Sequence, residues 1–159
     1  MGREIRRCPA NWEHPKDRQG IYKPLLDGDY PTHIRQWVER YLAWERGERP
    51  EYCTDESRGL QYWEWDVGPP QPEDYRPAWP ESEHTHYQVY ENVTEGTPIS
   101  PVFATTTEVV DWLVKQGHSR TAAEAFVEDG WAPSIVIVGN RMAMGIDAHD
   151  LMPPIGGVK

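Results

Sequence analysis

Residues 105–144, TTTEVVDWLVKQGHSRTAAEAFVEDGWAPSIVIVGNRMAM, decide the fold class of this chain. The T-x-x-E pattern at 105–108 is a capping box, which predicts a helix over about 106–116. Ser119 is a typical helix cap, and it predicts a second helix over about 120–129. Both segments carry apolar residues at helical spacing, so each helix is expected to bury one face.

The same stretch continues into the strongest strand signal of the sequence. SIVIV at 134–138 is rich in β-branched residues, and Gly139-Asn140 is a two-residue turn into RMAM at 141–144. Upstream, HYQVYENV at 86–93 also has the pattern of a strand. The second half of the chain therefore predicts helices and antiparallel strands together.

The first half is less regular. Residues 1–31 contain four prolines, so extended or irregular chain is expected there. A helix is predicted over about 32–46, with Thr32 as its cap. Its inward face is expected to hold Ile34, Trp37, Val38, Tyr41 and Leu42. LQYWEW at 60–65 alternates and predicts a short strand, with Tyr62 facing away from its two tryptophans.

Together these elements predict a small single-domain α+β protein over residues 1–152. We expect a loop-rich N-terminal half and a short antiparallel sheet packed with about three helices. Residues 153–159, which include two prolines and two glycines, are expected to form a mobile tail.

The charge is strongly uneven along the chain. The formal net charge is −10, and residues 51–100 hold eleven acidic residues against two basic ones. Proteins that bind DNA through many phosphates normally carry the opposite sign, so direct DNA binding is not expected. A small phosphate-bearing ligand remains compatible with this charge, because a few arginines and backbone N–H groups suffice to hold it.

The sequence points to no metal, cofactor or membrane association. Cys8 and Cys53 lack metal-ligand spacing, and whether they pair is left open. No apolar run approaches about 20 residues, the length needed to span a bilayer. Glycine-rich phosphate loops, GxSxG and HExxH are also missing, so no catalytic residue is assigned and a binding role is favoured over an enzyme.

Aromatic rings and arginine gather in and after the proline-rich segment 48–86. The candidate ligand-binding residues here are Trp63, Trp65, Arg76, Trp79, Tyr87 and Tyr90. Aromatic faces stack on bases, and a guanidinium binds phosphate. The alternative is that these rings hold a loop-rich domain together, as large aromatic residues commonly do.

Polar side chains are concentrated in YQVYENVTEGTPISP, residues 87–101. The candidates for orienting a ligand are Gln88, Glu91, Thr94, Thr97 and Ser100. Such groups at a junction between regular elements suit ligand recognition. Equally, they could serve the turn backbone, as Asn, Ser and Thr usually do.

His84 and His86, in His84-Thr85-His86, are the histidine pair considered as candidates for acid–base chemistry. On a strand, residues two apart face the same way, so both imidazoles could act on a phosphodiester. Exposed histidines without a role are the alternative, and a metal site would need two further ligands that the spacing does not supply.

Three stretches resemble a known family: WEWDVGPPQPEDYRPAW at 63–79, HYQVYENVTEGTPISPVFAT at 86–105 and GWAPS at 130–134. They are similar to small accessory proteins encoded by tailed bacteriophages and prophages, over roughly residues 3–138. The resemblance brings no active-site residue with it. It implies a protein in the host bacterial cytoplasm, often one that counters host immunity.

The resulting hypothesis is a phage-encoded binding protein that sequesters a nucleotide-derived signalling ligand. We expect a homo-oligomer, because proteins of this kind commonly form pockets between subunits. One alternative is an acidic protein–protein inhibitor or DNA mimic that blocks a bacterial defence protein, through residues 51–100. The other is a phosphodiesterase-like enzyme that degrades the signal, with His84 or His86 as acid and base.

Overall fold

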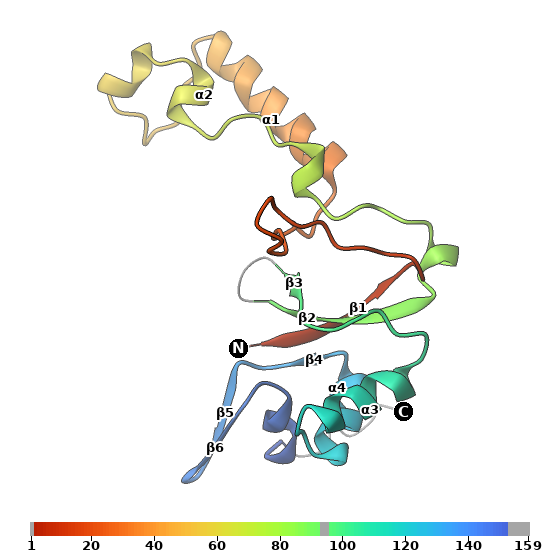
Figure 1. The fold of residues 1–159 in the computed structure, drawn as a ribbon. Coiled ribbons are helices and arrows are strands. Elements are labelled where there is room, and N and C mark those ends of the chain that lie inside the picture. The colour runs from red at the N-terminus through yellow and green to blue at the C-terminus, as the bar shows by residue number, and fades with distance from the viewer. Residues whose placement is uncertain (1, 93–95, 153–159) are drawn as a thin grey trace, which may run out of the picture. The chain divides into compact units, whose positions relative to one another are not determined.

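The computed structural model describes residues 2–92 and 96–152 (Figure 1). The chain divides into two compact units: unit 1 consists of residues 1–24 and 79–159, and unit 2 of residues 25–78. Each unit has its own hydrophobic core.

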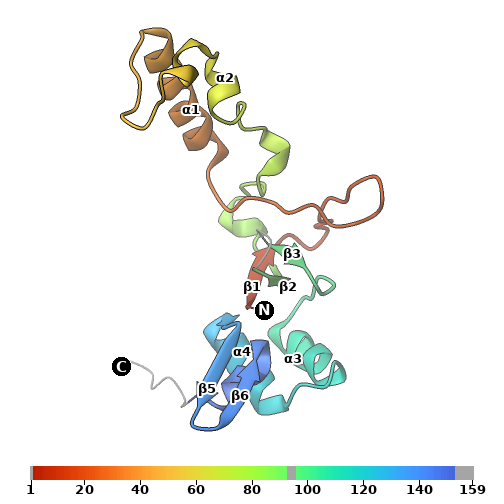
Figure 2. The ribbon, with the colours of Figure 1, turned by 90° about the vertical axis from the view of Figure 1, so that its left-hand side faces the viewer.

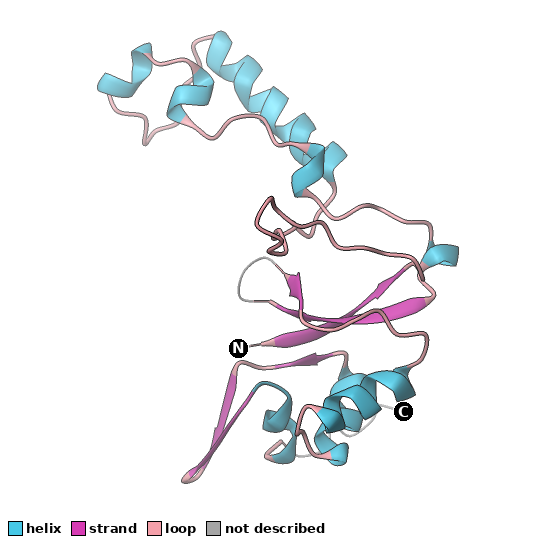
Figure 3. Cartoon of the chain, viewed as in Figure 1, coloured by secondary structure: helices cyan, strands magenta, loops and turns pink. Residues whose placement is uncertain are grey.

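Unit 1 is built on a four-stranded antiparallel sheet in the order β3-β2-β1-β4 (Figure 3). The strands are β1 (Arg3–Cys8), β2 (His86–Glu91), β3 (Thr97–Pro98) and β4 (Trp131–Ala132). β2 confirms the strand predicted from HYQVYENV. β1 lies in the sheet interior, where its Ile5 is opposite Val89, and sequence analysis expected only extended or irregular chain there.

Two helices contact this sheet, α3 (Thr106–Lys115) on β2 and α4 (Arg120–Asp129) on β4. The predicted caps are confirmed: the Thr105 side chain accepts the amide of Glu108, and Ser119 accepts that of Ala122. The apolar faces of both helices meet the sheet in one core. Its buried residues are Val89, Val109, Val110, Leu113, Ala122, Ala123, Phe126, Ala132 and Ile146.

The predicted hairpin is also confirmed, as β5 (Ile135–Val138) and β6 (Arg141–Met144). Gly139 in its turn has φ 62°, the left-handed region that a two-residue turn requires and that glycine adopts without strain. The hairpin is a separate two-stranded sheet and does not extend the four-stranded one (Figure 2). A 3₁₀ segment, Gly145–Asp150, follows it and contacts both of its strands.

Unit 2 begins with the longest helix, α1 (Tyr30–Glu45). Its cap is Asp29 and Pro31 lies in its first turn, so the prediction that Thr32 caps the helix was wrong. Proline fits the first turn because its missing N–H would have no partner there, and this moves the helix start upstream. The inward face also differs from the prediction, because Val38 and Leu42 are exposed while Trp44 is buried.

LQYWEW does not form a strand. Residues 62–65 form the one-turn helix α2 (Tyr62–Trp65), and the Glu64 carboxylate accepts the backbone N–H of Gln61 at 2.9 Å. The i, i+3 spacing in a helix turns Tyr62 and Trp65 toward the same core, whereas a strand would have separated them. The 3₁₀ turns Glu56–Gly59 and Pro72–Asp74 complete the unit.

Aromatic rings supply the core of unit 2. Trp44, Cys53 and Tyr62 are buried, and the rings of Trp37, Tyr41 and Trp65 pack against them. Large rings compensate for the shortage of aliphatic residues here, since each can bury about 150–250 Å².

The α+β fold class, with a short antiparallel sheet and three main helices, is confirmed. The single domain over 1–152 stays a prediction, and the expected tail 153–159 lies outside the described residues. None of the helices in 2–92 and 96–152 has the length and apolar character needed to cross a bilayer.

Candidate functional site

The predicted ligand-binding residues are divided between the two units. Unit 2 contains Trp63, Trp65 and Arg76, and Thr94 lies outside the described residues. Unit 1 contains Trp79, Tyr87, Gln88, Tyr90, Glu91, Thr97 and Ser100. Of the predicted residues, Gln88 and Ser100 line one cavity in unit 1, and Trp65 lines a pocket in unit 2.

Tyr90 is the centre of a buried polar network in unit 1. The residue is 1% exposed, and its hydroxyl donates to Oε1 of Gln88 at 2.8 Å. The same hydroxyl accepts the indole N–H of Trp12 at 3.1 Å and lies 3.3 Å from Nδ1 of His14. Burial lowers the pKa of His14, and this favours its neutral form. Tyr90 thus presents no free face to a ligand.

Gln88 and Ser100 join β2 to the chain that follows β3. The Gln88 amide donates to the carbonyl of Ser100 at 2.9 Å, and the Ser100 hydroxyl accepts the amide of Val89 at 2.8 Å. Both residues line a cavity of about 850 Å³, with Trp12, His14, Lys16 and Tyr22 among its other walls. Their polar groups are engaged in backbone positioning, which is the alternative that sequence analysis left open.

The remaining candidates in unit 1 contact neighbouring side chains. Glu91 forms an ion pair with Arg3 at 3.2 Å and accepts the Thr97 hydroxyl at 3.3 Å. The Trp79 ring meets Trp12 edge to face at 4.7 Å between centroids. The Tyr87 ring lies under the Arg7 guanidinium at 5.8 Å.

In unit 2, two of the three candidates also serve local contacts. Arg76 forms an ion pair with Asp27 at 3.6 Å, and the exposed ring of Trp63 stacks on Tyr41 at 6.4 Å. Trp65 differs, because it lines a pocket of about 500 Å³.

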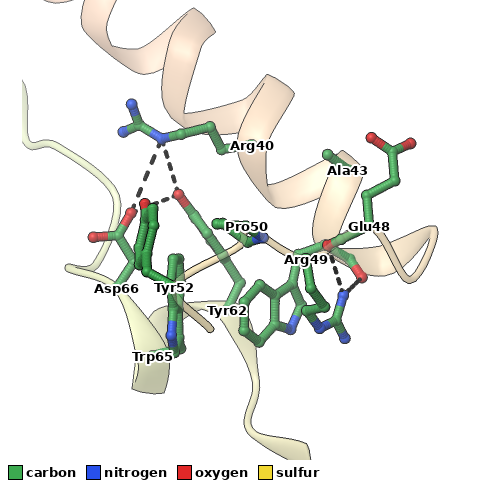
Figure 4. Close-up of a pocket in the computed structure, with 10 residues that line it drawn as sticks. Arg40, Ala43, Glu48, Arg49, Pro50, Tyr52, Tyr62, Trp65 and Asp66 are labelled. Atoms are coloured by element: carbon green, nitrogen blue, oxygen red, sulfur yellow. Dashed lines mark hydrogen bonds and ion pairs between the residues drawn. The ribbon is translucent and has the colours of Figure 1, made fainter. Parts of the chain in front are cut away.

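We call this hollow the aromatic–arginine pocket (Figure 4). Its volume is within the range of small-molecule sites. α1 and α2 provide five of the ten lining residues, the chain after α1 provides four, and Asp66 follows α2. The lining residues are Arg40, Ala43, Trp44, Glu48, Arg49, Pro50, Tyr52, Tyr62, Trp65 and Asp66.

Four planar groups form a continuous stack along this pocket. The Tyr52 and Trp65 rings are stacked at 5.8 Å, and Trp65 is stacked on Trp44 at 4.7 Å. The Arg49 guanidinium lies over the Trp44 ring, 3.8 Å from its centroid. Tyr52, at the outer end, is 78% exposed. The stack therefore runs from the half-buried Arg49 to the exposed ring of Tyr52.

A hydrogen-bonded triad forms one side of the pocket. Tyr62 donates its hydroxyl to Asp66 at 2.6 Å and accepts Nε–H of Arg40 at 3.0 Å. Burial, and then the bond to Asp66, raises the pKa of Tyr62. The bond to Tyr62 raises the pKa of Arg40. Tyr62 therefore stays protonated and Arg40 stays charged at neutral pH.

Arg49 is held differently from Arg40. It donates to the carbonyl oxygens of Trp44 at 2.5 Å and Glu48 at 3.0 Å. The Glu48 carboxylate is paired with Arg46 at 2.7 Å. Across residues 2–92 and 96–152, Arg49 has no carboxylate partner, so its charge is available to an anion.

Sequence reasoning did not identify Arg40, Trp44, Arg49, Tyr52 or Tyr62 as site residues. One local signal existed, because Arg40 and Trp44 are four residues apart and share a helix face. The return of Tyr52 and Trp65 onto that face depends on the chain path after Gly47, which no short spacing encodes.

The two histidines of the predicted pair contact different neighbours. His84 lies before β2 and is 3.2 Å from Glu81, whereas His86 opens the strand and contacts the Thr85 hydroxyl at 2.9 Å. In the described part of the chain, no cluster of three or more His, Cys, Asp or Glu side chains could hold a metal ion.

Comparison with protein-family models, curated proteins and solved structures finds no match to this chain.

Proposed function

We propose that this protein binds and sequesters a nucleotide-derived signalling ligand, and that the aromatic–arginine pocket is the binding site. The observation that carries the proposal is the stack of Tyr52, Trp65 and Trp44 beside the uncompensated Arg49. The aromatic stack would recognise a planar ring, and the Arg49 guanidinium would recognise a negative charge.

The base of the ligand would stack on Trp65. Tyr52, which now covers that ring, is exposed and lies in a turn, so it can move aside or close over a base. Stacking on an aromatic side chain contributes about 1–3 kcal/mol per base and tolerates different bases. The pocket would therefore bind planar heterocycles as a class, with little preference for one base over another.

The phosphate would be bound by Arg49. The lining contains two arginines and two carboxylates, of which Asp66 lies 4.0 Å from Arg40, and Glu48 is paired with Arg46 outside the lining. Arg49 is therefore the lining arginine that has no carboxylate partner within residues 2–92 and 96–152, although residues 51–100 are strongly acidic. Exposed carboxylates more than about 8–10 Å from Arg49 would act on it weakly, because solvent ions screen them.

The side chains that line the pocket suit retention of an unchanged ligand better than its enzymatic conversion. The lining contains no histidine or cysteine, and Tyr62 is kept protonated by its raised pKa. A general base or nucleophile needs a group that ionises near the working pH. The ligand would leave this pocket intact.

The resemblance to phage accessory proteins suggests the setting. In the cytoplasm of an infected bacterium, removal of a nucleotide signal would keep a host defence effector inactive. The protein needs only affinity and abundance for that role, because each copy withdraws one molecule per pocket.

A release experiment tests the proposal. The purified protein is incubated with a panel of mono-, di- and cyclic nucleotides and ADP-ribose derivatives, separated from free ligand and heat-denatured. We expect an intact panel member in the released fraction by mass spectrometry. A product of altered mass would instead support the phosphodiesterase alternative, and an empty fraction would contradict nucleotide capture.

Arg49→Ala gives the residue-level test of the same pocket. Loss of a charge-assisted contact should weaken ligand binding about tenfold or more, measured by calorimetry with the ligand found above. Arg58→Ala is the matched control, because Arg58 is an exposed arginine of unit 2 outside the pocket lining, and its ion-pair partner Asp55 is outside the lining too. Equal losses in both variants would show that general charge, and not the pocket, drives binding.

The acidic inhibitor or DNA-mimic alternative keeps one specific support. Carboxylates in residues 51–100 are highly exposed, with Asp55 at 96% and Glu81 at 83%. A contact made through such charges should weaken steeply with added salt, whereas a stacking pocket should respond little. Binding to a basic defence protein, with strong salt dependence and an empty release fraction, would favour this alternative.

A further inference from the structure

One face of the β5–β6 hairpin is apolar and uncovered. It consists of Ile135, Ile137, Met142 and Met144, whose exposed fractions are 47%, 65%, 63% and 57%. Ile135 is opposite Met144 and Ile137 is opposite Met142, so the four side chains form two adjacent cross-strand pairs. The other face, with Val136 and Ala143, is partly buried.

Such a face is unusual on a strongly acidic chain. Exposed apolar side chains are common singly, but a contiguous group of them marks an interaction surface. The hairpin has only two strands, and a two-stranded sheet is marginal in water without further packing. A partner on this face would therefore stabilise the hairpin as well as bind it.

We propose that this face is covered by the same face of a second copy of the chain, in a two-fold symmetric dimer. The four side chains carry no charge, whereas each copy carries a net charge of −10. Two identical copies can approach through an uncharged face with the least like-charge repulsion. A two-fold dimer also requires a self-complementary patch, and the paired isoleucine and methionine rows supply one.

The proposed dimer has a definite arrangement of these rows. A two-fold axis parallel to the strands places the isoleucine row of one copy over the methionine row of the other, at the same level along the strands. Ile137 of each copy then meets Met142 of its partner copy. A stiff β-branched side chain is thereby packed against a flexible one, which can adapt to its shape.

The area is sufficient for a modest interface. The exposed parts of these side chains present on the order of 500 Å² of apolar surface per copy. The dimer would hide on the order of 1,000 Å², which is about the lower limit for a specific interface. We therefore expect a reversible dimer that forms at micromolar concentrations.

Sedimentation velocity across micromolar concentrations is the first test. Wild-type protein should shift from monomer to dimer, and Ile137→Lys should remain monomeric under the same conditions. Ile21→Lys is the control, since Ile21 is equally exposed in unit 1 but lies outside the hairpin. Ile137→Thr keeps the β-branched shape and should also weaken the dimer. It provides the test if Ile137→Lys fails to fold.

Mixing two variants tests the arrangement itself. Ile137→Lys and Met142→Glu should each be monomeric alone, and together they should form a heterodimer, because the new opposite charges face each other across the two-fold axis. Wild-type protein that stays monomeric at every concentration would overturn the proposal. So would a mixture without a heterodimer, or an Ile137→Lys chain that dimerises as well as the control.

Discussion

The hydroxyl of Tyr62 links two charged side chains in the candidate pocket. It donates to Asp66 at 2.6 Å and accepts from Arg40 at 3.0 Å, while the ring itself is buried in the core of unit 2. One tyrosine thus serves both the packing of the unit and the shape of the pocket wall. The raised pKa of Tyr62 shows that its neutral form is the one these contacts require.

Tyr62→Phe should separate these two contributions. The ring volume stays the same, but Arg40 and Asp66 lose their shared partner, so we expect a loss of about 1 kcal/mol in the free energy of unfolding. Urea unfolding followed by tryptophan fluorescence measures it. Tyr52→Phe is the control, because its hydroxyl has no hydrogen-bond partner among the described residues and its ring is exposed. Equal stabilities of the two variants would argue against a structural role for the triad.

Caps determine where the helices of unit 1 begin. At α3 the Thr105 hydroxyl accepts the amide of Glu108 at 3.2 Å, and the Glu108 carboxylate accepts the amide of Thr105 at 3.1 Å. Each group satisfies a backbone donor that the first helical turn leaves open. The helix then presents Val109 and Leu113 to the core in the correct register.

Thr105→Ala should destabilise unit 1 by about 1 kcal/mol, the usual cost of losing an N-cap. Thermal unfolding by circular dichroism, at constant pH and salt, is the measurement. Thr107→Ala provides the comparison two residues away, since Thr107 is an exposed helical residue whose side chain forms no hydrogen bond within the described chain. Helix propensity alone should make Thr107→Ala neutral or slightly stabilising, so an equal loss of stability in both variants would contradict the role of the Thr105 cap.

The same chemistry explains the wrong prediction at α2. Gln61 and Glu64 have capping-box spacing, yet the alternation of LQYWEW favoured a strand. A stretch this short satisfies both patterns, and burial decides between them. The helix wins because it places Tyr62 and Trp65 together against Trp44.

The whole chain contains two hydrophobic cores of different composition. Unit 1 has mostly aliphatic residues around Phe126, whereas unit 2 has rings around Trp44. Phe126 and Trp44 are 0% and 4% exposed, so they are comparable anchors of their own units. A substitution that disrupts one core should therefore first increase hydrogen exchange at the backbone amides of its own unit.

Hydrogen–deuterium exchange tests this division. Phe126→Ala and Trp44→Ala should each cost roughly 3–5 kcal/mol locally. Phe126→Ala is expected to speed exchange in α3 and α4, and Trp44→Ala in α1, with the other unit near wild-type protection. Each variant serves as the control for the other. Uniformly faster exchange across all three helices in both variants would indicate one cooperative core instead.

Local patterns predicted α3, α4, β2 and the β5–β6 hairpin, because caps, turns and periodicity act over a few neighbouring residues. The aromatic character of Trp65 made it a candidate, and it lines the pocket. Three features emerge from the folded chain alone: β1 lies inside the sheet, residues 62–65 are helical, and Arg49 lies over Trp44 in that pocket. Those outcomes depend on partners that are distant along the chain or on burial, and no local pattern contains either.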